Sequence, residues 1–224
     1  MKLFIDTANL QEIKEAQALG ILDGVTTNPS LMAKEGICGE EKIMQHYIDI
    51  CNVVDGDVSA EVISTDFEGM VAEAEKLASL HEQIVVKIPM IKEGIKVIKY
   101  LASKKIRVNC TLIFSPGQAL LAAKAGAAYV SPFIGRLDDT STDGLELIAQ
   151  LRHIFDNYGY ETEILAASIR HTMHIIKCAE IGADVTTSPF KVILGLLYHP
   201  LTDIGLENFL ADHKKANHVS KNSS

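Results

Sequence analysis

The sequence lacks the features that mark secreted, membrane-spanning or multidomain proteins. No Pro-, Ser- or Gly-rich linker divides its 224 residues, and 47% of them are hydrophobic, which predicts one domain with a large core. No apolar run approaches the roughly 18 residues that a membrane-spanning helix needs. An acid at Asp6 follows the start too soon for a signal peptide. We therefore expect a cytoplasmic protein with no membrane partner.

Positive charge is also scarce. The formal net charge is −8, and the densest basic sites are the pairs Lys104-Lys105 and Lys214-Lys215, which are typical of solvated helix ends. Nucleic acid is therefore not an expected partner. The four cysteines form no Cys-x-x-Cys pair, which predicts reduced thiols rather than a disulfide framework or a zinc site. They are Cys38, Cys51, Cys110 and Cys178.

The chain does contain a regular alternation of short apolar segments and amphipathic helical patterns. Eight candidate strands cover residues 3–6, 24–28, 58–62, 84–89, 108–113, 129–134, 163–168 and 184–188. Eight successive βα units predict a parallel sheet that closes into a (β/α)8 TIM barrel with its helices outside. A doubly wound open sheet is the alternative. It is weakened because Asp6-Thr7-Ala8-Asn9 stands where a Gly-x-Gly-x-x-Gly turn would follow the first strand.

Capping signals support this division into helices. Ser115-Pro116 and Gly126 predict the start and the end of one helix, and Thr65-Asp66 and Thr142-Asp143 predict the starts of two others. An additional C-terminal helix, at about 203–215, is not needed to close the barrel. We assign 1–217 to the barrel domain and 218–224 to a disordered polar tail.

Lys87 is the most informative single residue. It lies in the β-branched run Ile84–Pro89, which is typical of a strand buried on both faces. A buried ammonium needs a partner or gives up its proton, so burial lowers the lysine pKa and frees the amine to attack a carbonyl and form a Schiff base. The structural alternative is a strand-end lysine that reaches solvent or pairs with a carboxylate.

Polar residues stand at the ends of nearly all the predicted strands, where the active sites of TIM barrels gather. Spacings of two place Asn109 with Thr111, and Ser131 with Phe133, on shared faces. A rim of carboxylates, amine, amides and guanidinium groups predicts an active site. In chain order the rim residues are Asp6, Thr26, Thr27, Asn28, Glu61, Lys87, Asn109, Thr111, Ser131, Phe133, Arg136, Ser168, Arg170, Thr186 and Ser188.

Each rim residue also has a structural alternative. Asp6 and the Asn28-Pro29-Ser30 turn can cap helices. Arg136 can pair with Asp138 or Asp139 on the surface. Arg170 can complement Glu180 or remain solvated. The functional interpretation rests on the whole set rather than on any one member.

Five motifs, in order along the barrel, resemble the transaldolase family. They are Gly24–Met32, Val86–Pro89 with Gly94, Asn109–Ser115, Ser131–Arg136 and Ala166–Arg170. The length resembles the short bacterial members, which are similar to fructose 6-phosphate aldolase. One departure is Ile91, where related sequences tend to carry Ser or Thr.

The resemblance implies roles for most of the rim residues. Lys87 would attack the ketose carbonyl, and the resulting iminium would act as electron sink, so that no cofactor or metal is expected. Asp6 would take the proton of the C4 hydroxyl, while Glu61 and Thr111 would hold a water. The residues left for substrate binding are Asn28, Asn109 and Ser131 at the retained dihydroxyacetone unit, Phe133 beside them, and Arg136, Ser168 and Arg170 at the phosphate.

The choice between transferase and lyase depends on two positions. The aldolase branch usually has Tyr and Gln where this chain has Phe133 and Glu61, and a phenyl ring cannot donate a proton to the enamine. We therefore expect a transaldolase of the non-oxidative pentose phosphate pathway. It would move a dihydroxyacetone unit from sedoheptulose 7-phosphate to glyceraldehyde 3-phosphate.

Several alternatives stay open. They are a fructose 6-phosphate aldolase, a noncatalytic sugar-phosphate-binding barrel, and a metal-dependent enzyme that uses His171 and His174. The expected partners are phosphorylated sugars. The resemblance also implies a homo-oligomer, a pentamer or a decamer.

Overall fold

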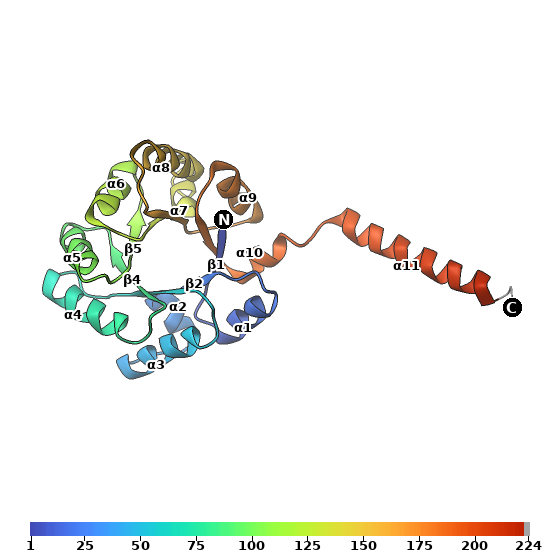
Figure 1. Cartoon of the computed structure of the whole chain (residues 1–224), viewed down its shortest axis with the longest axis horizontal. Coiled ribbons are helices and arrows are strands. Elements are labelled where there is room, and N and C mark those ends of the chain that lie inside the picture. The colour runs from blue at the N-terminus through green and yellow to red at the C-terminus, as the bar shows by residue number, and fades with distance from the viewer. Residues whose placement is uncertain (222–224) are drawn as a thin grey trace.

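The computed structural model describes residues 1–221 and shows a closed barrel of eight parallel strands in chain order (Figure 1). Each strand begins within one residue of its predicted start, so the predicted TIM barrel is confirmed. Three strands end two residues earlier than predicted, because a helix or a turn begins there. The strands are β1 (Lys2–Asp6), β2 (Gly24–Thr26), β3 (Asp57–Glu61), β4 (Ile84–Pro89), β5 (Val108–Ile113), β6 (Tyr129–Pro132), β7 (Glu163–Ala166) and β8 (Val185–Ser188).

Helices cover the outside of the barrel (Figure 1). The predicted caps are confirmed, since Asp66, Ser115 and Asp143 each accept a backbone N–H of the helix that follows. Ile91, the departure noted above, gives its helix no side-chain cap. The helices are α1 (Leu10–Ala18), α2 (Pro29–Lys34), α3 (Glu40–Cys51), α4 (Phe67–Ala78), α5 (Lys92–Ser103), α6 (Pro116–Ala125), α7 (Ile134–Asp138), α8 (Gly144–Tyr158), α9 (Thr172–Ile181), α10 (Phe190–Gly195) and α11 (Pro200–Lys221).

The interior of the barrel has an apolar layer below a polar one. The apolar layer is a buried cluster of Phe4, Val85, Tyr129, Leu165 and Val185. Gly24 leaves room for the Phe4 ring, because a Cβ there would lie 2.5 Å from Phe4 Cζ. Because side chains alternate along a strand, the residues two further along from this layer also face inward. Four of these five are polar, namely Asp6, Lys87, Ser131 and Thr187, and the fifth is Ala167. The main apolar core lies outside, between the sheet and the helices.

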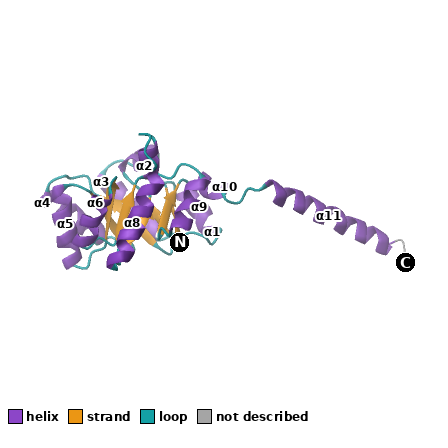
Figure 2. Ribbon diagram, turned by 90° about the horizontal axis from the view of Figure 1, so that it is seen from above, coloured by secondary structure: helices purple, strands orange, loops and turns teal. Residues whose placement is uncertain are grey.

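Helix α11 projects away from the barrel (Figure 2). It is longer at both ends than the predicted 203–215. Its helical backbone continues to Lys221, which corrects the predicted disorder for residues 218–221, while 222–224 lie outside the described residues. Over the described chain, no helix combines the length and the apolar character needed to cross a bilayer.

Candidate active site

Two adjoining hollows at the carboxyl ends of the strands form one opening, which we call the rim cavity. The smaller hollow has a volume of about 130 Å³ and the larger about 340 Å³. Both are lined by Asn28, Lys87, Phe133 and Arg136. Asp6, Thr26, Ser131, Ala167, Ser168 and Thr187 complete the smaller hollow. The larger one adds Pro29, Ser30, Leu31, Lys34, Glu61, Thr111 and Leu112.

Lys87 lies at the junction of the two hollows. The strand register places it between Glu61 of β3 and Asn109 of β5, and only 6% of its surface is exposed. Its Nζ lies 3.0 Å from Oε2 of Glu61. The predicted burial is confirmed, and the carboxylate that the structural alternative required is present as well. A buried ammonium is stable only when paired. The burial of the Lys87 ammonium therefore depends on the Glu61 carboxylate beside it.

Asp6, at the end of β1, lines the smaller hollow together with Lys87 of β4. Its Oδ1 accepts a hydrogen bond of 2.8 Å from Thr26 Oγ1, which lies 2.6 Å from Thr187 Oγ1. Burial raises the pKa of Asp6, and the Lys87 charge and the Thr26 hydroxyl partly oppose this shift. The capping role considered for Asp6 is wrong, because Asn9 caps α1. This raised pKa makes Asp6 a candidate proton acceptor within the cavity.

A short hydrogen-bond chain supports Ser131 from below. Ser131 donates to Asn109 Oδ1 at 2.7 Å, and Asn109 Nδ2 donates to Ser59 Oγ at 3.2 Å. Asn109 is fully buried and is absent from the described lining of the cavity. It therefore holds Ser131 in place, and its predicted contact with substrate stays a prediction.

Thr111 lines the larger hollow together with Glu61. Within the described residues its buried Oγ1 has no hydrogen-bond partner. A buried hydroxyl without a partner is costly, so this atom is suited to bind a water or a substrate oxygen. The water expected between Thr111 and Glu61 stays a prediction.

Arg136 and Asn28 both present donors to the cavity. The Arg136 guanidinium lies 4.8 Å from the centre of the Phe133 ring. Among residues 1–221, no carboxylate is within ion-pairing distance of Arg136, so the surface pairs considered for it do not form. Asn28 Oδ1 accepts from Leu31 N and caps α2, which leaves its amide N–H groups available.

Ser168 and Arg170 lie in the loop that follows β7. Ser168 adopts a left-handed backbone with φ 59° and lines the smaller hollow. Arg170 does not line the described cavity: its Nη2 pairs with Asp139 Oδ2 at 2.7 Å, and its side chain is 51% exposed. The partner considered from sequence, Glu180, pairs with Lys177 instead.

Some rim residues were misplaced by the sequence analysis. The register pairs Phe4 with Thr187, so Thr187 faces inward, while Thr186 and Ser188 face the helices. The hydroxyls of Thr27, Thr186 and Ser188 are buried without a described partner. Ser59, Thr187 and Lys34 were missed as site residues, and counting in twos from Val185 would have identified Thr187.

The two histidines considered as metal ligands lie outside the rim cavity. Their ring centroids lie 3.8 Å apart, with the ring planes tilted by 45°. His174 uses both ring nitrogens within the protein, since Nδ1 accepts from Arg170 N and Nε2 lies 3.1 Å from Asp138 Oδ2. Over residues 1–221, no group of three or more His, Cys, Asp or Glu side chains is placed to hold a metal ion.

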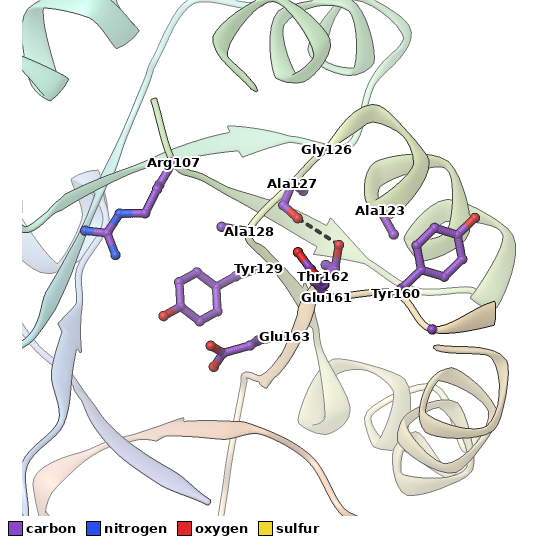
Figure 3. Close-up of a pocket in the computed structure, with 11 residues that line it drawn as sticks. Arg107, Ala123, Gly126, Ala127, Ala128, Tyr129, Tyr160, Glu161, Thr162 and Glu163 are labelled. Carbon is purple, nitrogen blue, oxygen red and sulfur yellow. Dashed lines mark hydrogen bonds between the residues drawn. The ribbon is translucent and has the colours of Figure 1, made fainter. Parts of the chain in front are cut away.

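Another open cavity, of about 480 Å³, lies at the opposite end of the barrel (Figure 3). Two of its three charged lining residues already have partners, since Arg107 pairs with Asp57 and Glu163 pairs with Lys2. The third, Glu161, is exposed. Thr162 donates to the Ala127 carbonyl, as Figure 3 shows. This is the end of a TIM barrel that serves stability rather than chemistry, and we assign no reaction to it.

Comparison with known proteins agrees with the rim geometry. The family model described as transaldolase/fructose-6-phosphate aldolase matches residues 3–223. The chain belongs to this family. A probable transaldolase of Flavobacterium psychrophilum is 70% identical over 97% of this chain and 100% of its own length. A probable transaldolase of Cytophaga hutchinsonii has the same identity and coverage, and one of Phocaeicola vulgatus is 67% identical. Membership in the transaldolase/fructose-6-phosphate aldolase family supports an aldolase-type enzyme.

The position of Asp6 leads to a first prediction. Asp6→Asn should lower turnover by about 10² or more, because a neutral amide cannot accept the substrate proton. It should also raise the free energy of unfolding at pH 7. Burial raises the pKa of Asp6 in the folded protein. Above the unfolded pKa of about 3.9, ionisation of Asp6 therefore lowers the free energy of unfolding, and this loss grows as the pH rises through the folded pKa.

Urea unfolding at pH 4 and pH 7, together with an activity assay, checks this prediction. Asp55→Asn is the matched control, because Asp55 is exposed and should change neither quantity. Full activity in Asp6→Asn, or a loss of stability at pH 7, would contradict the assignment.

Proposed function

We propose that this protein is a transaldolase that moves a dihydroxyacetone unit from sedoheptulose 7-phosphate to glyceraldehyde 3-phosphate through a Schiff base on Lys87. The products are erythrose 4-phosphate and fructose 6-phosphate, as in the non-oxidative pentose phosphate pathway. The observation that carries the proposal is the buried Lys87 amine, which lies between Glu61 and Asp6 in an open polar cavity. The names of the close relatives support it.

Imine formation needs a proton acceptor beside the amine. Glu61, at 3.0 Å from Nζ, takes a proton from the Lys87 ammonium, and the free amine attacks C2 of the ketose. The C2 oxygen takes up protons and leaves as water, which gives the iminium. Thr111, with its unpartnered hydroxyl beside Glu61, holds the water that carries these protons.

Carbon–carbon cleavage then uses Asp6. Its carboxylate takes the proton of the C4 hydroxyl, the C3–C4 electron pair moves to the iminium nitrogen, and the aldose phosphate leaves. The enamine attacks the carbonyl carbon of the acceptor aldehyde, and Asp6 returns its proton to the new alkoxide. Hydrolysis of the product iminium frees Lys87. The raised pKa of Asp6 suits a group that both takes and returns a proton.

Phosphate recognition falls to the cations at the edge of the cavity. Arg136 reaches both hollows and has no carboxylate partner among the described residues. Ser168 adds a hydroxyl in the smaller hollow. In this proposal Arg170 exchanges its exposed pairing with Asp139 for the substrate phosphate, since a divalent oxyanion is the stronger partner for a guanidinium fork.

Reductive trapping tests the nucleophile and the substrate class together. Borohydride added in the presence of fructose 6-phosphate should fix a six- or three-carbon adduct on the peptide that carries Lys87, because hydride converts the iminium into a stable secondary amine, whereas reduced free sugar does not label the protein. Peptide mass mapping locates the adduct. Lys87→Arg is the matched control, since it keeps the charge and cannot form the iminium. Labelling elsewhere would contradict the assignment, and no labelling would favour the noncatalytic barrel.

The second candidate function is a fructose 6-phosphate aldolase, which the name of the family includes. Phe133 argues against it. Its ring packs edge-on against the Phe114 ring, with centroids 5.7 Å apart, and against the Arg136 guanidinium. A phenyl ring offers no proton to the enamine. The enamine should therefore persist until an aldehyde arrives.

Phe133→Tyr should raise the release of free dihydroxyacetone from fructose 6-phosphate by at least about tenfold, because the new phenol can protonate the enamine. Release is measured with and without erythrose 4-phosphate as acceptor. Phe114→Tyr is the control, because it adds a hydroxyl to the neighbouring ring. It should leave the ratio of release to transfer unchanged. Unchanged release in Phe133→Tyr would show that another group controls the choice.

We also propose that the protein is a homo-oligomer assembled through α11. Five large apolar side chains on this helix, Leu201, Ile204, Leu206, Phe209 and Leu210, are each between 52% and 75% exposed. The helix leaves its own barrel (Figure 2), and an apolar face of this size in water marks an association surface. A second copy of the chain supplies the partner, as family resemblance also suggests.

Light scattering should give a mass of five or ten times the 24.4 kDa of one chain. Leu206→Asp with Phe209→Asp should reduce it to one chain, because two charges would then be buried at the contact. Tyr158→Asp changes a residue of α8 that is equally exposed and should preserve the assembly. A wild-type protein that elutes as one chain would refute the proposal.

A cytoplasmic location is part of the same proposal. All four cysteines are free thiols, as the sequence analysis predicted, and three of them are buried. Unpaired cysteines are typical of reducing compartments.

A further inference from the structure

His174 is a buried histidine for which the proposed chemistry has no use. It belongs to α9 and is only 5% exposed. It contacts two segments that both carry phosphate-binding residues, which are the loop after β7 and the short helix α7. Buried polar groups are usually hydrogen-bonded within the protein. We therefore expect each ring nitrogen of His174 to have a partner that helps to position the segments around it.

The hydrogen bonds of His174 define its protonation. The backbone N–H of Arg170 donates to Nδ1 at 3.3 Å, so Nδ1 carries a lone pair. The proton then lies on Nε2, which is 3.1 Å from Oδ2 of Asp138. Only the neutral ring with its proton on Nε2 satisfies both contacts.

Asp138 connects this histidine to the arginine on α7. It is the last residue of α7, which also carries Arg136, and its Oδ1 accepts from Gly144 N at 2.9 Å. The loop after β7 meets the start of the same helix, since Gly135 N donates to Ser168 O and Ile134 N to Ala167 O, both at 3.0 Å.

We propose that His174 is a positioning residue that holds the Ser168–Arg170 loop against α7, so that Ser168, Arg170 and Arg136 converge on the substrate phosphate. The proposal rests on the proposed function only in the identity of the phosphorylated ligand. Gly135 fits this arrangement, because a Cβ there would lie 2.4 Å from both Arg170 Nε and Ser168 O. The spacing between the two segments is therefore fixed closely.

The surroundings of His174 keep it in the required neutral form. Burial lowers its pKa, the neighbouring His171 ring and the Arg170 charge act in the same direction, and Asp138 opposes them. A doubly protonated ring would have no acceptor for the Arg170 N–H.

Two substitutions separate the contributions of the two hydrogen bonds of His174. The Asn side chain in His174→Asn ends near the position of Nδ1 and can accept from Arg170 N. The Gln side chain in His174→Gln reaches toward Asp138 and leaves Arg170 N without its acceptor. The probe is inorganic phosphate, with its dissociation constant measured by calorimetry on the full-length protein, so that the readout does not depend on turnover.

We expect His174→Gln to weaken phosphate binding about five- to tenfold, as the loss of one buried acceptor predicts, and His174→Asn to stay within about threefold of wild type. His153→Gln and His153→Asn, on the exposed side of α8, should leave phosphate binding unchanged. Equal phosphate affinity in wild type and His174→Gln would overturn the proposal, as would equal losses in both His174 variants.

Turnover gives a second readout that separates this proposal from the proposed function. For fructose 6-phosphate, His174→Gln should raise KM with little change in kcat, while kcat/KM for unphosphorylated fructose should not change. A general structural defect would lower kcat/KM for both sugars equally and would overturn the proposal. If wild type turns over neither sugar, the proposed function fails and the phosphate titration still decides the role of His174. If His174→Gln does not fold, Asp138→Ala removes the other contact and should weaken phosphate binding as well.

Discussion

The ion pair between Lys87 and Glu61 is the interaction on which the rest of the site depends. An ammonium inside a barrel is tolerated only when a carboxylate accompanies it, because removing one charge from water alone is too costly. The parallel register sets this pair at 3.0 Å by placing β3 and β4 side by side. In the proposed reaction the same contact gives the amine a proton acceptor. One carboxylate would then meet both the requirement for stability and the requirement for imine formation.

The two ends of the barrel differ in their side chains: apolar and paired charged groups fill the amino ends of the strands, and the candidate site lies at the carboxyl ends. Phe4, Val85 and Tyr129 fill the lower interior, and the charged groups at the amino ends of the strands pair among themselves. Two residues further along the strands most inward positions are polar, and hydroxyls and amides form hydrogen bonds across strands. Groups without a described partner, among them Arg136, the Asn28 amide N–H groups and the Thr111 hydroxyl, line the opening and are available to a ligand.

Much of this arrangement could be predicted from sequence because local signals determine it. The run Ile84–Pro89 predicted a buried strand with Lys87 inside it, and Ser115 and Asp143 marked helix starts by their capping chemistry. Strand β8 was misjudged because Thr186, Thr187 and Ser188 are all small and polar, so their own composition does not show which of them faces inward. Only their spacing from Val185 does. The helix at 218–221 was missed because a polar composition resembles disorder, although an existing helix propagates at little cost.

The contacts that could not be predicted join residues far apart in the chain. Arg170 pairs with Asp139, and His174 reaches Asp138, through the packing of α7 against the loop after β7. No periodicity or spacing encodes these pairs. The rim was predictable because parallel strands bring their ends together, whereas the partner of each side chain there depends on the loops.

A crystal structure of the protein soaked with fructose 6-phosphate and frozen during turnover tests the central claim most directly. The account predicts continuous electron density from Lys87 Nζ to C2 of the sugar, with Asp6 within hydrogen-bonding distance of the C4 oxygen and the phosphate beside Arg136. An intact ketose in the rim cavity with its carbonyl remote from Lys87, or a covalent bond to another side chain, would contradict it.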